Sequence, residues 1–379
     1  MKDIKIENSE KKVEYIELIY DLIFVYMTGR NNQIIHTFET GFVARGAFMT
    51  YVLSTLAIIQ IWNFTTFYIN MFGRNGVRDH IFLFVNMYLL YFIGQGTRND
   101  WQAFQTQYHI AWGLILLNIG LQYCIELRNH KKKCWNRDII IRMAATLFTE
   151  AVFVFVAVIP NTTLGIIFSI AAIFSGIILT AISRSKSAGG KVDFMHLSER
   201  AMLFVVFTFG EMIIAVASYF MGDGTVSINT IYFSLMAFLI VVGLFLSYGY
   251  IYDHLIDREG EYDGMLYMAL HIFIIFFMNN ITASLEYMQE ETIDLLPKMI
   301  FLIISVVGYF AFLFFLRSYM KKSSRPTKLL AVVMVVMTAV FAVSMILLCK
   351  MMAVNILITL VYVFGMFGLI YFNKQTKNT

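Results

Sequence analysis

The chain has 379 residues, of which 59% are hydrophobic and only 14% are charged, and its net charge is +4. This composition excludes an ordinary soluble domain, in which about a quarter of the residues are charged. Only three prolines are present, and apolar segments of roughly 20 residues recur, which is typical of membrane-spanning helices rather than of barrel strands. We therefore predict an all-α polytopic membrane protein, folded as a bundle of helices.

Hydropathy along the chain predicts twelve membrane-spanning helices. They cover residues 15–37, 45–72, 79–97, 105–126, 139–159, 162–183, 196–220, 229–252, 264–287, 294–317, 327–349 and 352–372. The polar segment Met1–Lys12 is mixed in charge and no small-residue cleavage pattern follows, so we expect the first span to be retained. The cysteines at 124, 134 and 349 lack metal-ligand spacing, so no metal or cofactor is expected.

Basic residues set the expected orientation, because Lys and Arg concentrate in cytoplasmic loops. With the N-terminus inside, most of the 29 Lys and Arg lie on the cytoplasmic face. The exceptions, on the other face, are Arg30, Arg45, Arg98, Lys298 and Lys350. We therefore expect a multi-pass protein of the cell membrane with both termini in the cytoplasm. The basic run 128–137 is also of the kind that binds nucleic acid or lipid headgroups, but the topology signal explains it more simply. Membrane lipid is an expected partner and nucleic acid is not.

The loops are short, which indicates a single transmembrane domain over residues 1–379. The longest polar gap on the cytoplasmic side, Ser183–Phe194, lies near the middle and leaves six spans on each side. The sequence is thus compatible with halves 1–190 and 191–379 that form a parallel 6+6 pseudo-repeat, as in several transporter folds.

Two acids lie within the first predicted span. Glu17 and Asp21 are one helical turn apart and share a face. Glu17 is close enough to the membrane boundary to be solvated there and to favour the helix N-terminus. Asp21 lies a turn deeper, where a charged side chain costs about 2.5–3.5 kcal/mol, so it requires a buried partner or a water-filled cavity.

Amide side chains form polar faces on two other spans. Gln60, Asn63 and Asn70 lie on span 45–72, and Asn118 and Gln122 lie one turn apart on span 105–126. These amides either line a polar pathway or form hydrogen bonds between helices, worth about 0.6 kcal/mol each in a membrane.

Span 196–220 begins with His196, Glu199 and Arg200, in the same cytoplasmic third of the bundle that Glu17 and Asp21 reach. We therefore expect an ion pair between Arg200 and an acid of the first span. The pair either clamps the two helices together or acts as a gate, because desolvation makes a lone buried pair weak evidence for stability.

Glu150 and Glu211 lie about 12 to 15 residues inside their spans, near the middle or outer half of the membrane core. Burial disfavours a charged carboxyl, so each is expected either to exchange protons, as coupling sites of transporters do, or to remain protonated in a hydrogen bond.

Spans 327–349 and 352–372 carry little polarity and are expected to face lipid or another copy in a homo-oligomer. The expected working part is spans one to five and seven.

Two motifs resemble those of a known family. The first is Glu17-Leu-Ile-Tyr-Asp21-Leu-Ile-Phe-Val25, and the second runs from His196-Leu-Ser-Glu199-Arg200 to Gly210-Glu211. Both resemble motifs of the bacterial low temperature requirement protein A (LtrA) family over roughly residues 14–220. In the same region, the loop of residues 73–76, which tends to be acidic in that family, reads Gly-Arg-Asn-Gly here. The resemblance implies a membrane protein named for a cold-growth phenotype.

The distributed polar faces and deep acids favour a transporter of a small solute or ion, coupled to protons. A non-catalytic sensor or lipid-adaptation protein is the first alternative. A membrane-embedded enzyme is the second, although the sequence contains no nucleophile elbow, metal motif or phosphate loop to support it.

Overall fold

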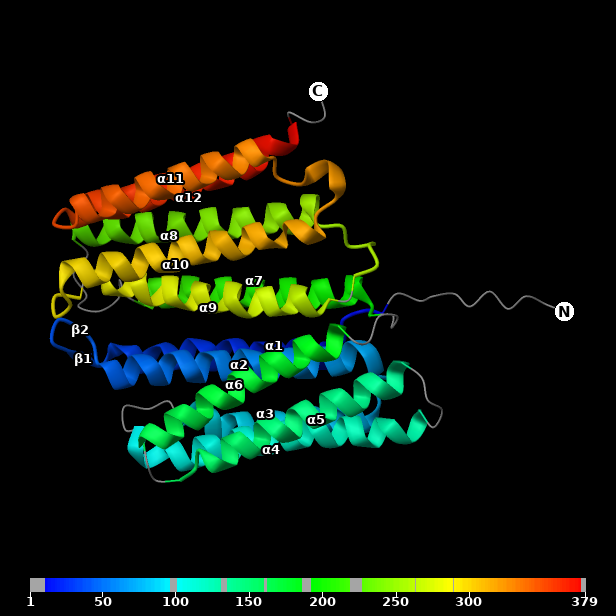
Figure 1. Cartoon of the computed structure of the whole chain (residues 1–379). Coiled ribbons are helices and arrows are strands. Elements are labelled where there is room, and N and C mark those ends of the chain that lie inside the picture. Colours follow the sequence, from blue (N-terminus) through cyan, green and yellow to red (C-terminus); the bar gives the residue numbers. More distant parts are fainter. Residues whose placement is uncertain are drawn as a thin grey trace.

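The computed structural model describes residues 11–95, 101–130, 135–159, 162–185, 192–218, 227–262, 264–288 and 290–375. Within these ranges the chain forms twelve α-helices that run roughly parallel or antiparallel to one another (Figure 1). The helices are α1 (Tyr15–Asn31), α2 (Arg45–Phe72), α3 (Val77–Gln95), α4 (Trp101–Glu126), α5 (Trp135–Val156), α6 (Thr162–Ser185), α7 (Phe194–Ser218), α8 (Ile228–Tyr250), α9 (Met265–Tyr287), α10 (Leu295–Phe315), α11 (Lys328–Leu347) and α12 (Met352–Gln375). The all-α prediction is confirmed. Ten of these helices are long and apolar enough to cross a membrane, and the other two, α1 and α3, have 17 and 19 residues.

Successive helices alternate in direction, so α1 and α7 begin at the end of the bundle at which α12 finishes (Figure 1). We call this the inner end, because the predicted orientation places it in the cytoplasm, and the opposite end the outer end. The boundary predicted between the halves, at residues 190 and 191, lies outside the described residues.

The first helix is shorter than predicted. It ends at Asn31, and a 3₁₀ turn (Asn32–His36) and a hairpin of β1 (Phe38–Glu39) and β2 (Phe42–Val43) follow. The Asn31 side chain donates to Thr55 Oγ1 at 2.6 Å, which anchors this helix end to α2. Thr40 and Gly41 both have positive φ in the two-residue turn, the geometry of a type I′ hairpin. The Asp294 backbone N–H donates to Gly41 O at 2.7 Å, so the hairpin packs over the start of α10.

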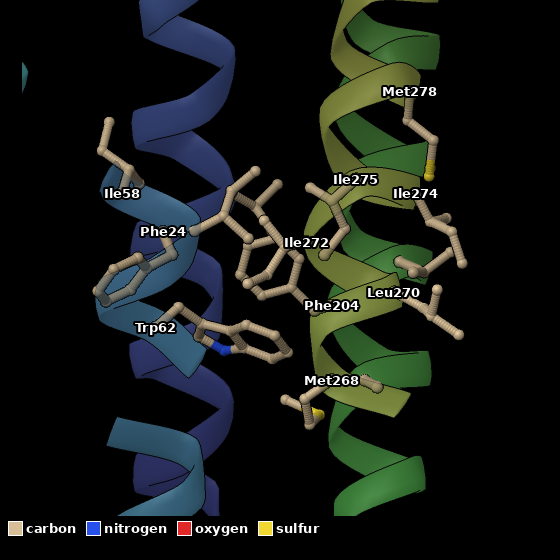
Figure 2. Close-up of a cluster of buried hydrophobic side chains, with 14 of the residues drawn as sticks. Phe24, Ile58, Trp62, Phe204, Met268, Leu270, Ile272, Ile274, Ile275 and Met278 are labelled. Carbon is tan, nitrogen blue, oxygen red and sulfur yellow. The ribbon is translucent and has the colours of Figure 1, made fainter. Parts of the chain in front are cut away.

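The centre of the bundle is formed by α1 and α2 packed against α7 and α9. Trp62 of α2 and Phe204 of α7 meet across this interface, with ring centroids 4.4 Å apart (Figure 2). Phe24, Ile58, Ile272 and the neighbouring apolar side chains fill the rest of the same level (Figure 2). This apolar layer separates polar groups at the inner end from those at the outer end.

The remaining helices form two flanking groups, α3 to α6 on one side and α8, α10, α11 and α12 on the other (Figure 1). Among the first six helices the contacting pairs are α1–α2, α1–α3, α2–α4, α2–α6, α3–α4, α4–α5 and α5–α6. Six of these pairs have a counterpart among the last six helices, from α7–α8 to α11–α12, whereas α8–α10, the counterpart of α2–α4, is not among the main contacts between described residues. Helix α11 is the most peripheral, since Met334, Phe341 and Met345 are its buried residues.

Candidate functional site: a buried ion-pair cluster and two cavities

An ion pair joins α1 to α7 in the inner half of the bundle. Arg200 Nη2 pairs with Asp21 Oδ1, and Arg200 Nε donates to Asp21 Oδ2 at 3.3 Å. Trp62 Nε1 donates to Asp21 Oδ1 at 2.7 Å. All three side chains are 0% exposed, so protein groups rather than water must satisfy these charges.

A second pair lies one turn closer to the inner end. Glu17 Oε2 is 3.2 Å from His196 Nε2 and 3.3 Å from Arg200 Nε. His196 Nδ1 lies 3.0 Å from Asn70 Nδ2, which also donates to the backbone oxygen of Asp193 at 2.8 Å. We refer to Glu17, Asp21, Asn70, His196 and Arg200 together as the inner cluster.

Helical spacing explains why these groups meet. Glu17 and Asp21 are four residues apart on α1, and His196 and Arg200 are four residues apart on α7, so each pair occupies one helix face. Because α1 and α7 run in the same direction, the two faces meet in register as Glu17–His196 and Asp21–Arg200. One donor of Arg200, Nη1, is buried without an acceptor among the described residues.

The α1–α7 contact has a different character at the outer end, where a cavity of about 200 Å³ lies between α1, the 3₁₀ turn, α7 and α9. Glu211 lines it from α7 and packs on α1, with Oε1 2.5 Å from the position that a Cβ on Gly29 would take. Glu286 of α9 lines the other side and lies 3.1 Å from His36 Nε2. Glu211 is half-buried, so it is less enclosed than its depth in the sequence predicts.

A second cavity, of about 220 Å³, lies in the inner half between α2, α5, α6 and α9. Gln60, Asn63 and Thr180 are its polar lining, and the rest is mainly apolar. We call this the inner-half cavity and the one at Glu211 the outer cavity. The inner-half cavity lies away from the α1–α7 contact, since its lining residues come from neither helix.

Glu150 lies beside the inner-half cavity. Its side chain is 0% exposed, and neither carboxyl oxygen has a hydrogen-bond partner among the described residues. Glu150 Oε2 and Gln60 Nε2 lie 2.2 and 2.1 Å from the position that a Cβ on Gly176 would take. The missing side chain of Gly176 therefore makes the room in which Glu150 and Gln60 approach each other and the cavity.

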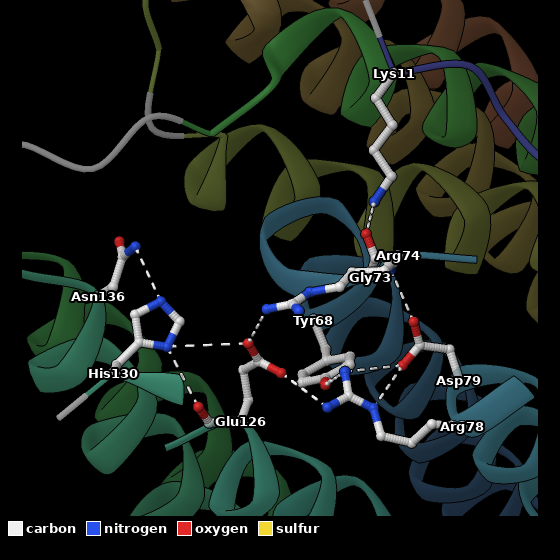
Figure 3. A network of polar contacts seen from close by, with 9 residues as sticks. All are labelled: Lys11, Tyr68, Gly73, Arg74, Arg78, Asp79, Glu126, His130 and Asn136. Carbon is white, nitrogen blue, oxygen red and sulfur yellow. Dashed lines mark hydrogen bonds and ion pairs between the residues drawn. The ribbon is translucent and has the colours of Figure 1, made fainter. Parts of the chain in front are cut away.

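A third polar network lies at the inner end of α2, α3 and α4 (Figure 3). The buried Glu126 carboxylate accepts from Arg74 Nη2 and from Arg78 Nη1, each at 2.9 Å, and Arg78 also pairs with Asp79. Lys11 Nζ donates to Ile69 O, in the last turn of α2, and to Gly73 O, which directly follows the helix. Figure 3 shows the contact with Gly73. Arg74 belongs to the loop of residues 73–76, and its side chain forms an ion pair with Glu126.

The other predicted residues are dispersed. Asn118 is half-buried and donates to Asn86 Oδ1 at 2.8 Å, whereas Gln122 is buried one turn away with neither amide atom paired among the described residues. Among those residues, no hydrogen bond or ion pair joins the half-buried Glu199 to the inner cluster. The twelve predicted residues therefore do not form one continuous site.

Helix α9 was not part of the predicted working region, yet it lines both cavities. Met265 and Ile272 line the inner-half cavity, and Asn279 and Glu286 line the outer cavity. The signal available in the sequence was the polar series Asn279, Asn280, Thr282 and Glu286 in one apolar span.

These features define the class: a polytopic α-helical membrane protein with a charged cluster and two cavities buried among its helices. Residues 12–364 match the family model described as bacterial low temperature requirement A protein (LtrA). The chain belongs to this family, which confirms the resemblance and extends it from residue 220 to nearly the whole chain. Searches of curated proteins and of solved structures found no match.

Proposed function

We propose that this LtrA-family protein is a secondary transporter of a small solute or ion and that its transport is coupled to protons. The observation that carries the proposal is the asymmetry of the α1–α7 contact. Its inner end is closed by the fully buried Asp21–Arg200 pair, and its outer end contains the outer cavity with Glu211. A contact closed at one end and hollow at the other is the geometry expected of a gated pathway.

In this proposal the inner cluster is the inner gate. Opening it requires that Arg200 leave two acids, so the gate is held by charge rather than by apolar packing. Protonation of Asp21 or Glu17 would weaken that hold, because only an ionised carboxylate attracts the guanidinium. The cluster therefore offers a direct link between proton uptake and opening.

Glu150 supplies a second protonation site. With no charged partner among the described residues, its ionised form is unstable in a low-dielectric interior, so the group is suited to carry a proton. Its position beside the inner-half cavity gives that proton a route towards the inner end. The outer cavity has an acid of its own in Glu211.

The arrangement of helices supports the same proposal. Six of the seven contacting pairs in the first half have a matching pair in the second half, which fits a parallel 6+6 repeat. The first helices of the two halves, α1 and α7, also contact each other. Transporters built from repeats move one half against the other around a central site. The proposed halves are residues 1–190 and 191–379 of one transmembrane domain.

The test is proton flux in liposomes that contain the purified protein, with internal pH followed under an imposed gradient. Glu150→Gln and Glu211→Gln should each abolish the flux, because the amide cannot carry a proton. Glu291→Gln is the matched control, since Glu291 is an exposed acid near the outer end of the bundle, and its flux should equal that of the unaltered protein.

Flux that persists unchanged in both Glu150→Gln and Glu211→Gln would contradict the assignment of these acids. Vesicles that respond no faster than protein-free vesicles, at any imposed gradient and with substrate mixtures present, would instead favour the sensor or lipid-adaptation alternative. A product that forms without translocation would favour the membrane-embedded enzyme.

A further inference from the structure

We infer that the outer cavity is a binding site for a small organic ammonium ion, a primary or secondary amine in its protonated form. The inference deepens the proposed function, on which it rests, by naming a substrate class. It depends on the charge of the cavity, on the hydrogen-bonding capacity of its lining and on its size.

The charge of the lining is negative. Glu211 and Glu286 face the same cavity from α7 and α9, close enough to influence each other electrostatically. Among the described residues that line the cavity, the basic side chain is His36. It lies 3.1 Å from Glu286, so it neutralises at most one of the two carboxylates. A cation between Glu211 and Glu286 would relieve the repulsion between them.

The hydroxyl groups of the lining use their protons within the protein, so they face the cavity as acceptors. Thr208 and Thr282 donate their hydroxyl protons to the backbone oxygens of Phe204 and Met278, at 2.9 and 3.1 Å. Asn279 donates through its amide nitrogen to Ile275 O at 2.9 Å. The lone pairs of both hydroxyls and the Asn279 amide oxygen remain as acceptors on this side of the cavity.

A buried acceptor without a partner provides an independent indication of a ligand. Asn32 lines the cavity with only 7% of its surface exposed, and its Oδ1 has no hydrogen-bond donor among the described residues. Buried amide oxygens are rarely left unpaired, because without a hydrogen bond nothing offsets the cost of removing them from water. An N–H group of a bound ammonium ion would satisfy Asn32 Oδ1 together with the carboxylates.

Size and ligand type narrow the class. The cavity of about 200 Å³ is smaller than the roughly 300–1,000 Å³ typical of pockets for drug-sized ligands, so the ligand has few heavy atoms. Among the described residues, no group of three or more His, Cys, Asp or Glu side chains is placed to hold a metal ion. An ammonium ion fits because it needs hydrogen-bond acceptors and two carboxylates, not a compact shell of metal ligands.

The test is calorimetric titration of the purified protein in lipid nanodiscs with methylammonium chloride. Tetramethylammonium chloride, which has the charge but no N–H donor, and sodium chloride are titrated alongside. We expect saturable binding of methylammonium, with affinity at least about tenfold lower for tetramethylammonium because Asn32 and the carboxylates would receive no hydrogen bond. Glu211→Gln and Glu286→Gln should each weaken methylammonium binding by about ten- to a hundredfold.

Glu291→Gln again removes one acid at the same end of the bundle. It should leave the affinity within twofold of that of the unaltered protein, because salt and water screen the charge of an exposed side chain. The unfolding temperature of each variant without ligand reports whether the fold is intact. If Glu211→Gln does not fold, Thr208→Val, which removes one acceptor and keeps the side-chain volume, should still weaken binding severalfold.

Equal affinity for tetramethylammonium or for sodium would overturn the inference, as would methylammonium binding that is unaffected by both Glu211→Gln and Glu286→Gln. No saturable binding up to about 10 mM, tenfold above the usual upper range of enzyme KM values, would overturn it too. Because binding is measured without flux, saturable binding by a protein that moves no protons would support this site while contradicting proton-coupled transport.

Discussion

Replacement of Arg200 by methionine should destabilise the protein more than any other single change in the inner cluster. Arg200→Met leaves Asp21 and Glu17 without the guanidinium that contacts both. Removal of one partner from a buried pair costs about 3–5 kcal/mol, because the remaining charge is left unpaired. Since two acids lose their partner here, we expect the cost at the upper end of that range.

Asp21→Asn should cost less, about 1.5–3 kcal/mol, which is the value of one hydrogen bond to a charged group. Arg200 keeps Glu17 at 3.3 Å, and the Asn amide oxygen can still accept from Trp62. Each single variant removes the Asp21–Arg200 interaction, and the double variant of Asp21→Asn and Arg200→Met removes it only once. The loss of stability in the double variant should therefore be about 1.5–3 kcal/mol smaller than the sum of the losses in the single variants.

The measurement is reversible unfolding of the four proteins by SDS in mixed lipid–detergent micelles, followed by tryptophan fluorescence. Arg128→Met serves as the control, because Arg128 is exposed, and it should change the free energy of unfolding by no more than roughly 0.5 kcal/mol. A surface ion pair contributes less than about 1 kcal/mol, so costs in that range for both single variants would refute the buried Asp21–Arg200 ion pair. Additive costs in the double variant would refute direct coupling.

Three further predictions concern other parts of the bundle. Gly176→Ala places a methyl group among buried atoms and should cost about 1–3 kcal/mol, whereas Gly368→Ala, with nothing within 4 Å, should be neutral or slightly stabilising; unfolding temperatures compare them. In the inner-end network, Glu126→Gln should destabilise the protein more than Arg74→Ala, because Glu126 is 1% exposed and Arg74 65%; equal losses in SDS titrations would contradict this. Burial lowers the pKa of Lys11 below its ordinary value of 10.5, so the Lys11 ammonium loses its proton at a lower pH in the folded state than in the unfolded state. The free energy of unfolding should therefore rise as the pH increases towards 10.5. Lys11→Met should remove that rise in unfolding curves recorded at several pH values.

The inner cluster was predictable because two rules suffice to find it. A charge inside a spanning helix requires a partner, and residues four apart share a helix face. Together they place Glu17 and Asp21 opposite Arg200, once the predicted orientation gives the two helices the same direction. The two rules left open which acid pairs with Arg200, and they did not predict the contact between Glu17 and His196.

The environment of Glu150 was not predictable in the same way. It depends on Gly176 of α6 and Gln60 of α2, so α2 must pack against the α5–α6 pair before the site exists. The role of α9 was missed for a related reason: its polar residues have no charged partner in the sequence pattern, and Glu286 lies at the helix end, where an acid needs no explanation. Only tertiary packing brings that helix against α2 and α7.

The chemistry of the α1–α7 contact favours a gate over a clamp. A contact that serves stability alone could be made from apolar side chains, since well-packed apolar groups commonly match or exceed a buried ion pair. Here the contact is instead built from four ionisable groups, and Arg200 Nη1 has no acceptor among the described residues. Desolvation makes such a contact costly to form, and protonation of either acid would make it easy to break. Because the outer cavity lies along the same two helices, separation of α1 and α7 at the inner end and through the apolar layer would connect it to the cytoplasmic side of the proposed pathway.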